Sequence, residues 1–242
     1  MKIAVYSDVH GNLEALTSVL KDMKREEPDK TYFLGDLVGY GPNPNECVDL
    51  IRENSDVVLA GNHDWAAVGL ADSSAFNPHA LESLTWTIEV LTDANKTFLK
   101  TLVPHAMADN VQLAHSTPLN PEEWRYLLSL QDAMDNYEAL KKNICFVGHS
   151  HQPMIMEYAD ASNLIPIRDL YKTLEPNRKY LINVGSVGQP RDSNRDACYL
   201  VYDEKEHNVE YRRVEYDVAR TQKKMTKLKL PEYLIRRLGE GR

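Results

Sequence analysis

The sequence Ile3-Ala4-Val5-Tyr6-Ser7-Asp8-Val9-His10-Gly11-Asn12 leads from an apolar run directly into a group of polar side chains. Three more short apolar runs, at 31–34, 57–60 and 144–147, end in the same way, and each predicts a buried strand. The polar segments that follow them are Gly35-Asp36, Gly61-Asn62-His63-Asp64 and Gly148-His149-Ser150-His151. The carboxyl ends of strands converge in an open α/β sheet, and ligands bind in the crevice that they form. Several Asp, His and Asn side chains at one crevice therefore predict a metal site.

Strand-like and helix-like patterns alternate in the first part of the chain. Apolar residues at helical spacing predict a helix over 12–25, after a strand over 3–7. A second unit has its strand at 31–34 and its helix at 47–53, with Asn45 as the predicted N-cap. This alternation implies parallel strands that are joined by helical crossovers.

The rest of the chain divides into a helical part, a strand-rich part and a second helical part. We expect a helical insertion over about 65–104 and a basic, helical C-terminal tail over about 218–242, broken by Pro231. One apolar stripe of the insertion consists of Leu81, Leu84, Ile88 and Leu91. Between these parts we expect a strand at 111–114, a helix at 133–141, and strands at 180–184, 197–202 and 209–214. Two mixed sheets packed face to face with helices outside would bury all of this. The predicted fold is therefore a four-layer α/β/β/α sandwich that forms a single domain over residues 1–242.

The composition limits the possible partners and the compartment. A net charge of −8, from 36 acidic and 28 basic residues, argues against tight binding of long nucleic acid. A small phosphorylated substrate is compatible with this charge, because bound divalent cations would dominate the local field. No apolar stretch approaches the length of a membrane span, and the chain enters a strand at Lys2 without a signal peptide. Cys47, Cys145 and Cys198 lack metal-type spacing, so we expect reduced, buried thiols in a cytoplasmic protein.

Taken in order, the polar motifs resemble those of a known family. Asp-x-His-Gly-Asn, Gly-Asp, Gly-Asn-His-Asp, a lone His at His115 and Gly-His-x-His look like the motifs of the calcineurin-like metallophosphoesterase superfamily. The segments at 38–44 and 183–192 are also similar to its smaller bacterial members, among them phosphodiesterases and dinucleoside-polyphosphate hydrolases. The resemblance implies the same four-layer α/β/β/α fold.

The resemblance also implies a binuclear metal centre. One ion would be held by Asp8, His10 and His151, Asp36 would bridge to the second, and Asn62, His115 and His149 would complete the second site. Carboxylates and neutral imidazoles suit Mn, Fe, Zn or Ni, with Mn or Fe favoured here. A bridging carboxylate helps to hold two cations about 3.5–4 Å apart despite their repulsion. For His149 alone, a role as a hydrogen-bonded loop residue is as well supported as a role as a metal ligand.

Two such ions would activate a bridging hydroxide for in-line attack on phosphorus, after which the leaving oxygen needs a proton. His63 directly follows Asn62 and precedes Asp64. A neighbouring carboxylate can orient an imidazole and favour its protonated form. We therefore predict His63 as the leaving-group acid and Asp64 as the residue that orients it, as the family pattern also implies.

Other residues are candidates for contacts with the substrate. Arg191 follows a turn with two glycines, and its guanidinium would suit a pair of phosphate oxygens, unless it is a solvated surface arginine. Tyr40 and Asn43 lie just after Gly35-Asp36 and are candidates for contact with a base or sugar. Trp86 is expected in the core. His79, His105 and His207 match no motif and are expected at the surface or in packing. Trp124 and Tyr126 are expected either beside the site or in the core.

The leading function is a metal-dependent phosphoesterase that acts on a small phosphodiester, nucleotide or dinucleoside polyphosphate. A cyclic-nucleotide or general phosphodiesterase is the first alternative, and a serine/threonine protein phosphatase is the second. A non-catalytic scaffold of the same fold is disfavoured, because His63 and every ligand position are filled. The oligomeric state stays open, a homodimer included.

Overall fold

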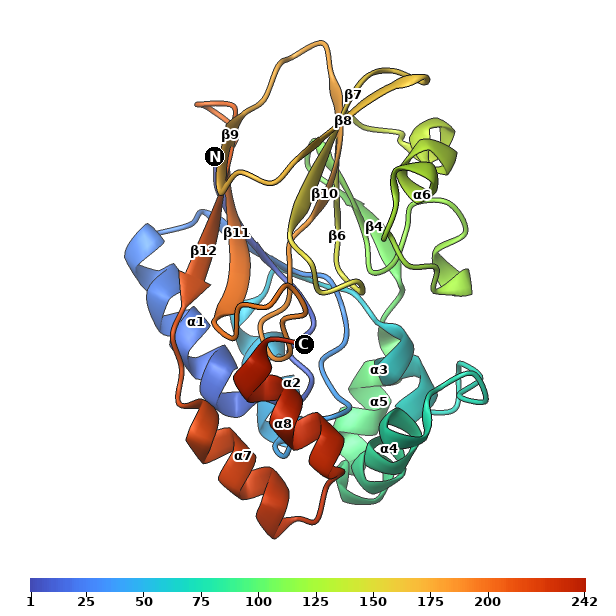
Figure 1. The fold of residues 1–242 in the computed structure, drawn as a ribbon, viewed down its shortest axis with the longest axis vertical. Coiled ribbons are helices and arrows are strands. Elements are labelled where there is room, and N and C mark those ends of the chain that lie inside the picture. The colour runs from blue at the N-terminus through green and yellow to red at the C-terminus, as the bar shows by residue number, and fades with distance from the viewer.

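Two six-stranded sheets form the centre of the molecule. The computed structural model describes residues 1–242 (Figure 1). The first sheet has the strand order β3-β2-β1-β11-β12-β9 and the second has the order β4-β5-β6-β10-β7-β8. The strands of the first sheet are β1 (Lys2–Tyr6), β2 (Lys30–Phe33), β3 (Val57–Val58), β9 (Tyr171–Thr173), β11 (Ala197–Asp203) and β12 (Asn208–Val214). Those of the second are β4 (His105–Ala108), β5 (Val111–Ala114), β6 (Ile144–Val147), β7 (Met154–Asp160), β8 (Asn163–Ile167) and β10 (Lys179–Asn183).

Both sheets are mixed, and each has a block of three parallel strands. In the first sheet β1, β2 and β3 are parallel, while β11 runs antiparallel to β1. The helices α1 (Leu13–Glu26) and α2 (Pro44–Asn54) make the crossovers between the parallel strands. In the second sheet β5, β6 and β10 are parallel, with β4 and β7 antiparallel beside them. The parallel strands are the ones whose carboxyl ends carry the polar motifs.

The alternation of side chains along the strands divides the core into layers. Along β1, Ile3 and Val5 belong to the apolar cluster between the two sheets, while Ala4 and Tyr6 face the cluster under α1 and α2. On the outer face of the second sheet, residues such as Cys145 pack with α6 (Leu130–Asp135). Figure 1 shows α1 and α6 on opposite outer sides of the paired sheets. The predicted four-layer α/β/β/α sandwich is confirmed.

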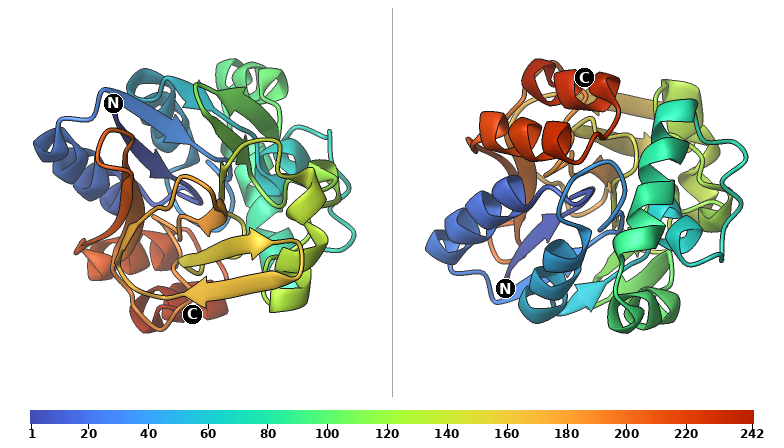
Figure 2. Two further views of the ribbon diagram at one scale, coloured as in Figure 1. Left: turned by 90° about the horizontal axis from the view of Figure 1, so that it is seen from above. Right: turned by 90° about the horizontal axis from the view of Figure 1, so that it is seen from below.

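Further helices gather at the end of the sandwich where the parallel strands finish. They are α3 (Asn62–Ala67), α4 (Pro78–Val90), α5 (Asp93–Thr101), α7 (Val218–Lys227) and α8 (Glu232–Glu240), within or close to the segments predicted as helical. Seen from below in Figure 2, the red helices α7 and α8 and the teal helix α4 occupy this end. A separate apolar cluster that includes Tyr40, Ala80, Leu234 and Leu238 joins α4 to α8. None of the helices is both long and apolar enough to cross a membrane.

Three helix predictions need correction. Helix α2 begins at Pro44, which suits the first helical position, and Asn45 does not cap it but donates from Nδ2 to the carbonyl of Val90. The helix expected over 133–141 is instead α6 with a separate 3-10 turn, η2 (Tyr137–Ala139). A reciprocal cap between Ser129 and Asp132 sets the start of α6 three residues earlier, at Leu130.

The third correction concerns the apolar stripe of α4. Leu84 and Leu91 are buried, but Leu81 and Ile88 are exposed. The face toward the core is completed by the small or polar residues Ala80, Ser83 and Thr87, which are all buried. Trp86 is half-buried against the cluster around Tyr40 and lies outside the main core. The strands β4, β7, β8 and β9 were not individually predicted.

The cysteine and histidine predictions outside the motifs agree with the structure. All three cysteines are free and buried. His79, His105 and His207 are exposed.

Candidate metal centre

The seven predicted ligands lie at the carboxyl ends of the parallel strands of both sheets. Asp8 and His10 follow β1, Asp36 follows β2, and Asn62 follows the short strand β3. From the second sheet, His115 follows β5, and His149 and His151 follow β6. The structure brings six of these side chains into two buried groups that fit metal ions, Asp8-His10-Asp36-His151 and Asp36-His115-His149. Asp36 belongs to both groups.

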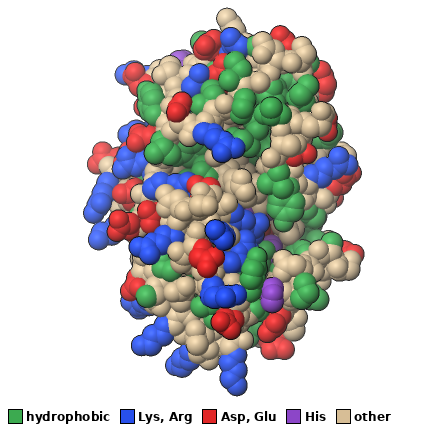
Figure 3. Space-filling model, in the orientation of Figure 1, with side chains coloured by type: hydrophobic (Ala, Val, Ile, Leu, Met, Phe, Trp, Pro, Cys, Tyr) green, Lys and Arg blue, Asp and Glu red, His purple; other side chains and the backbone are tan.

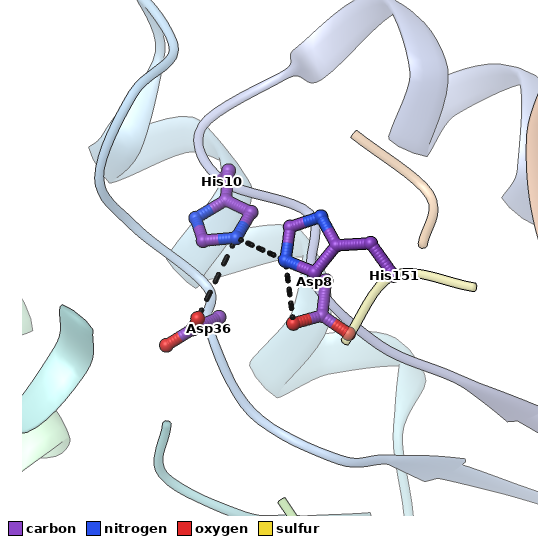
Figure 4. A group of neighbouring side chains, drawn as sticks. All are labelled: Asp8, His10, Asp36 and His151. Carbon is purple, nitrogen blue, oxygen red and sulfur yellow. Dashed lines mark hydrogen bonds and ion pairs between the residues drawn. The ribbon is translucent and has the colours of Figure 1, made fainter. Parts of the chain in front are cut away.

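The first group has the spacing of ligand atoms around one ion (Figure 4). His10 Nε2 lies 3.2 Å from His151 Nε2 and 3.5 Å from Asp36 Oδ2. His151 Nε2 lies 3.2 Å from Asp8 Oδ1. Ligand atoms about 2.1 Å from a tetrahedrally held ion are roughly 3.4 Å apart, so these separations fit a cation between them.

The second group contains buried polar atoms that no protein group satisfies. His115 Nε2 lies 3.4 Å from Asp36 Oδ2 but has no hydrogen-bond partner. Asn62 Oδ1 is also buried without a partner. Because an unsatisfied buried polar atom costs free energy, these two atoms indicate that a ligand belongs at this end of the strands. The donor set of carboxylate, imidazole and amide oxygen fits a divalent cation.

Each ligand imidazole is anchored through one nitrogen to a backbone carbonyl. His10 Nδ1 contacts the Val38 oxygen at 3.0 Å, and His115 Nδ1 contacts the Leu34 oxygen at 2.8 Å. The other two contacts join His151 Nδ1 to Gln189 O at 2.6 Å and His149 Nε2 to Trp124 O at 2.9 Å. A carbonyl only accepts, so the anchored nitrogen carries the hydrogen, and in the neutral imidazole the opposite nitrogen has a free lone pair. This arrangement fixes the tautomer that binds a metal.

The backbone of the ligand loops is unusual. Asp8, His10, Asp36, His149 and His151 all have positive φ values, between 48° and 63°. Such left-handed conformations are uncommon for residues with a side chain and concentrate at functional sites. On a regular strand, residues two apart point to the same face. His149 and His151 lie in a loop after β6 and have left-handed conformations, and they belong to different groups.

The charges of the site favour deprotonated ligands at most positions. Burial lowers the pKa of His149 to about 3 and that of His10 well below its usual range. Burial alone would raise the pKa of Asp36, but the imidazoles of His115 and His63 outweigh it and hold that pKa well below its usual range. For His115 burial is likewise outweighed, and Asp36 raises its pKa to about 9. A metal ion held by His115 would displace this proton.

His63 lies beside the first group, and Asp64 does not contact its ring. The His63 ring packs against Tyr40, His10 and Phe76, and its Nδ1 is buried without a partner. Burial lowers the pKa of His63 to about 4, although Asp36 opposes this shift. At neutral pH the His63 ring of the free protein is therefore neutral, and not protonated as the sequence led us to expect.

The prediction that Asp64 orients the His63 ring also needs correction. Its carboxylate accepts hydrogen bonds from the backbone N–H groups of Asp36, Val38 and Gly61, at 2.8, 3.1 and 2.8 Å. With its oxygens occupied in this way, Asp64 ties the loop after β2 to the start of α3. It positions His63 only through the backbone.

Two glycines leave the space that the site needs. Gly39 has φ = 85°, and a Cβ there would overlap His63 Nδ1. At Gly61 a Cβ would overlap the carboxylate of Asp36. Side chains at either position would displace a residue of the site.

The three predicted substrate contacts lie in different surroundings. Tyr40 is buried, its ring lies 4.4 Å from that of His10, and its hydroxyl is 3.4 Å from Arg191 Nη2. The Arg191 backbone N–H donates to the carbonyl of His151, so this residue borders the first group. Asn43, in contrast, accepts from Lys224 and donates to Glu46, and contacts neither metal group.

Some residues at the site were not assigned from the sequence. Tyr126 stacks on His149 at 4.2 Å between ring centroids, and Trp124 supplies the carbonyl that anchors that histidine, so both flank the site. The carbonyl of Gln189 anchors His151. Main-chain contacts of this kind leave no signature in side-chain type, although Gln189 lies within the segment 183–192 that already indicated a role.

Comparisons with known proteins agree with this geometry. A family model described as the calcineurin-like phosphoesterase superfamily domain matches residues 1–207, which leaves α7 and α8 beyond its end. An uncharacterised protein of Methanocaldococcus jannaschii is 42% identical over 246 residues, which cover 99% of this chain and 98% of that protein.

Solved structures give the same result. A metallophosphoesterase from Sphaerobacter thermophilus is 38% identical, with a TM-score of 0.89 and coverage of 100% of this chain and 99% of that one. A hypothetical protein from Pyrococcus horikoshii is 22% identical, with a TM-score of 0.78 and coverage of 100% and 98%, and it shares the fold.

Proposed function

The chain belongs to the calcineurin-like phosphoesterase superfamily and is a metal-dependent phosphoesterase, and on that premise we propose a two-ion hydrolase of small substrates. Its substrate would be a small phosphodiester, a nucleotide or a dinucleoside polyphosphate. The observation that carries the two-ion proposal is the position of Asp36, whose Oδ2 lies 3.5 Å from His10 Nε2 and 3.4 Å from His115 Nε2. One carboxylate thus faces both ligand groups, as a bridge between two cations requires.

The residues present define which groups would hold each ion. Asp8, His10 and His151 would hold the first, while His115, His149 and Asn62 would hold the second, with Asp36 shared. When bound, the two ions would make a water molecule nucleophilic at neutral pH and offset charge on the phosphoryl oxygens. The backbone N–H of His63 donates to Asp36 Oδ1 at 3.0 Å, which leaves Oδ2 directed at the ligand groups.

His63 is the proposed source of the proton for the leaving oxygen. In hydrolysis a new bond forms between water oxygen and phosphorus, the bond from phosphorus to the leaving oxygen breaks, and that oxygen takes up a proton. The pKa of His63 is about 4 in the free protein because the ring is buried. The negative charge of a bound phosphate would raise this pKa and allow the ring to carry the proton.

The substrate proposal rests on Arg191. Its side chain approaches the site beside Tyr40 and has no Asp or Glu within ion-pair distance, and its Nε is buried without a partner. The guanidinium is partly buried and its Nη2 contacts Tyr40 and Gln189. Without a counter-ion it is a binding group for an anion, and its planar fork suits a phosphate.

Metal analysis combined with turnover tests the proposal. Protein stripped by a chelator and titrated with Mn²⁺ should take up two ions per chain and then hydrolyse bis-p-nitrophenyl phosphate. His115→Ala should lose one ion and most activity, whereas His105→Ala, which removes an exposed imidazole from β4, should keep both. A single ion in the fully active wild type would overturn the two-ion proposal. Absence of turnover with Mn, Fe, Zn and Ni would overturn the proposed reaction.

A further inference from the structure

The segment 121–127 is fastened at both ends to the loops that carry the second ligand group. At its start, the carbonyl of Pro121 accepts a hydrogen bond from Ser116 Oγ at 2.8 Å. At its end, the N–H of Leu127 donates to Ser150 Oγ at 2.9 Å. The two serines directly follow the two histidines of the second group, and both are buried. The 121–127 segment and the second group are therefore held as one unit.

Within this segment, Trp124 contacts every element that supplies an unshared ligand of the second group. Its carbonyl lies 2.9 Å from His149 Nε2, and its ring lies 6.0 Å from that of His115, edge to face. The same ring meets Trp65 on α3 in a T-shaped contact at 5.5 Å. Helix α3 begins at Asn62, the third of these ligands. One residue thus connects the three parts of the second site.

Tyr126 covers one of the same histidines. Its ring stacks on that of His149, with the centroids 4.2 Å apart and 20° between the ring planes. Tyr126 is 45% exposed, whereas His149 is 4% exposed. Figure 3 shows hydrophobic side chains at the surface on this side of the molecule, around α6. The stacked tyrosine therefore separates the imidazole from water and limits its rotation.

The backbone of Trp124 has an uncommon conformation that its neighbours must maintain. Its φ of 53° lies in the left-handed region, where residues with a side chain are rare. Such conformations persist when the surrounding structure fixes them. Here the ring contact with Trp65 fixes one side of the residue, and the carbonyl contact with His149 fixes the other. The direction of the carbonyl therefore depends on the indole ring.

The first ligand group has separate supports. His10 is anchored by the carbonyl of Val38, and His151 is anchored by that of Gln189. The ring contacts of His10 are with Tyr40, His63 and His151, all outside the 121–127 segment. A change at Trp124 should therefore reach one group of ligands and not the other.

We propose that Trp124 and Tyr126 are positioning residues that set the affinity of the second ion and leave that of the first unchanged. They hold imidazole ligands in place before an ion arrives, so less order is lost on binding. This inference rests on the proposed two-ion function. It implies that the two ions bind in sequence when this segment is loosened, because only the second site is weakened.

Titration of ion-free protein with Mn²⁺ tests the proposal, followed by calorimetry and by electron paramagnetic resonance, in which two neighbouring Mn²⁺ ions give a coupled spectrum. Trp124→Ala should raise the Kd of the second ion about 10–100-fold, as is typical when a partner of a ligand is lost. The Kd of the first ion should change less than about twofold. Trp124→Phe should recover part of the affinity, because it keeps an aromatic ring.

Tyr126→Ala gives a second test at a partly exposed position, which counts if Trp124→Ala does not fold. It should also weaken only the second ion, and Tyr126→Phe should recover the loss, because stacking does not need the hydroxyl. Arg125→Ala is the matched control in the same segment: its side chain is 58% exposed and pairs with Glu123, so both Kd values should stay unchanged. An equal rise of both Kd values, or no rise of the second in either variant, would overturn the inference.

A wild type that binds only one ion would contradict the two-ion function, and ¹⁵N NMR of the histidine rings then decides this inference in ion-free protein. The wild-type His149 should show the single tautomer with hydrogen on Nε2, because the Trp124 carbonyl accepts from that atom. In Trp124→Ala, His149 should populate both tautomers, while His151 should keep one. If His149 also kept one tautomer in this variant, Trp124 would not position it.

Discussion

The two ends of the parallel strands differ in chemistry although both are rich in polar residues. At the amino ends of β5, β6 and β10 lies a cavity of about 460 Å³. Charged residues line it, among them Arg178, Glu204 and His207. There Arg178 pairs with Glu175 and Glu157, and Glu204 pairs with the N-terminal amine. At the carboxyl ends, by contrast, His115 and Asn62 have buried atoms without partners.

This difference shows that neither cavity size nor the number of charges identifies a reactive site. Most charged groups at the amino ends are exposed or pair with each other, so their interactions are weak. Glu157 is buried there, but Lys172 and Arg178 supply opposite charges beside it. At the carboxyl ends the same types of residue are buried, share Asp36 and have strongly shifted pKa values. Burial, and not composition, makes the second set able to bind ions. Substitutions at matched positions of the two ends test this view.

The largest effect is expected when the shared carboxylate loses its charge. Asp36→Asn should weaken ion binding in both groups at once. Loss of the ions removes several kcal/mol of transition-state stabilisation, which is roughly 10³-fold or more in kcat/KM. Metal content per chain and turnover of bis-p-nitrophenyl phosphate measure both effects. Asp109→Asn is the control near the other end of β2, where Asp109 pairs with Lys30 on the surface, and it should keep full activity. Two ions in Asp36→Asn would show that Asp36 is not the bridge.

The next effect separates proton transfer from ion binding. His63→Ala should retain both ions, because no ligand is removed, but lose about 10²-fold or more in rate on an ester with a poor leaving group. The loss should be smaller for p-nitrophenyl esters, whose leaving group hardly needs a proton. Rates for a series of leaving groups measure this difference. A loss of the same size across the series would count against His63 as the acid.

A smaller effect is expected from the guanidinium at the rim of the centre. Arg191→Ala should raise KM for a polyphosphate nucleotide roughly 10–150-fold, the range of a charged hydrogen bond of about 1.5–3 kcal/mol. For p-nitrophenyl phosphate, which reaches only the ions, KM should stay nearly constant. Arg191→Lys should recover part of the loss. Unchanged kinetic constants for the nucleotide would make Arg191 a structural residue.

The smallest effect is expected at the amino ends. His207→Ala removes an exposed imidazole from the large cavity, and metal content and kcat/KM should stay within about twofold of wild type. Thermal unfolding and turnover are the measurements. A tenfold loss of activity here would break the distinction between the two ends.

The sequence by itself determined the sandwich, the parallel strands and the position of the Asp, His and Asn side chains of the candidate metal centre. Short apolar runs followed by Asp, His and Asn need no tertiary information, because strand periodicity and chain direction already place those side chains at one end of a sheet. Helix boundaries were less predictable. The cap between Ser129 and Asp132 and the two-sided environment of α4 depend on neighbours that sequence spacing does not reveal.

Only the tertiary structure decided how the residues of the site act on one another. The carbonyls that anchor the four imidazoles come from Leu34, Val38, Trp124 and Gln189, whose side-chain types carry no signal for this role. Asp64 follows His63 in sequence, yet its carboxylate binds backbone N–H groups because α3 begins between them. Such relations arise from long-range packing, which local patterns of residues do not encode.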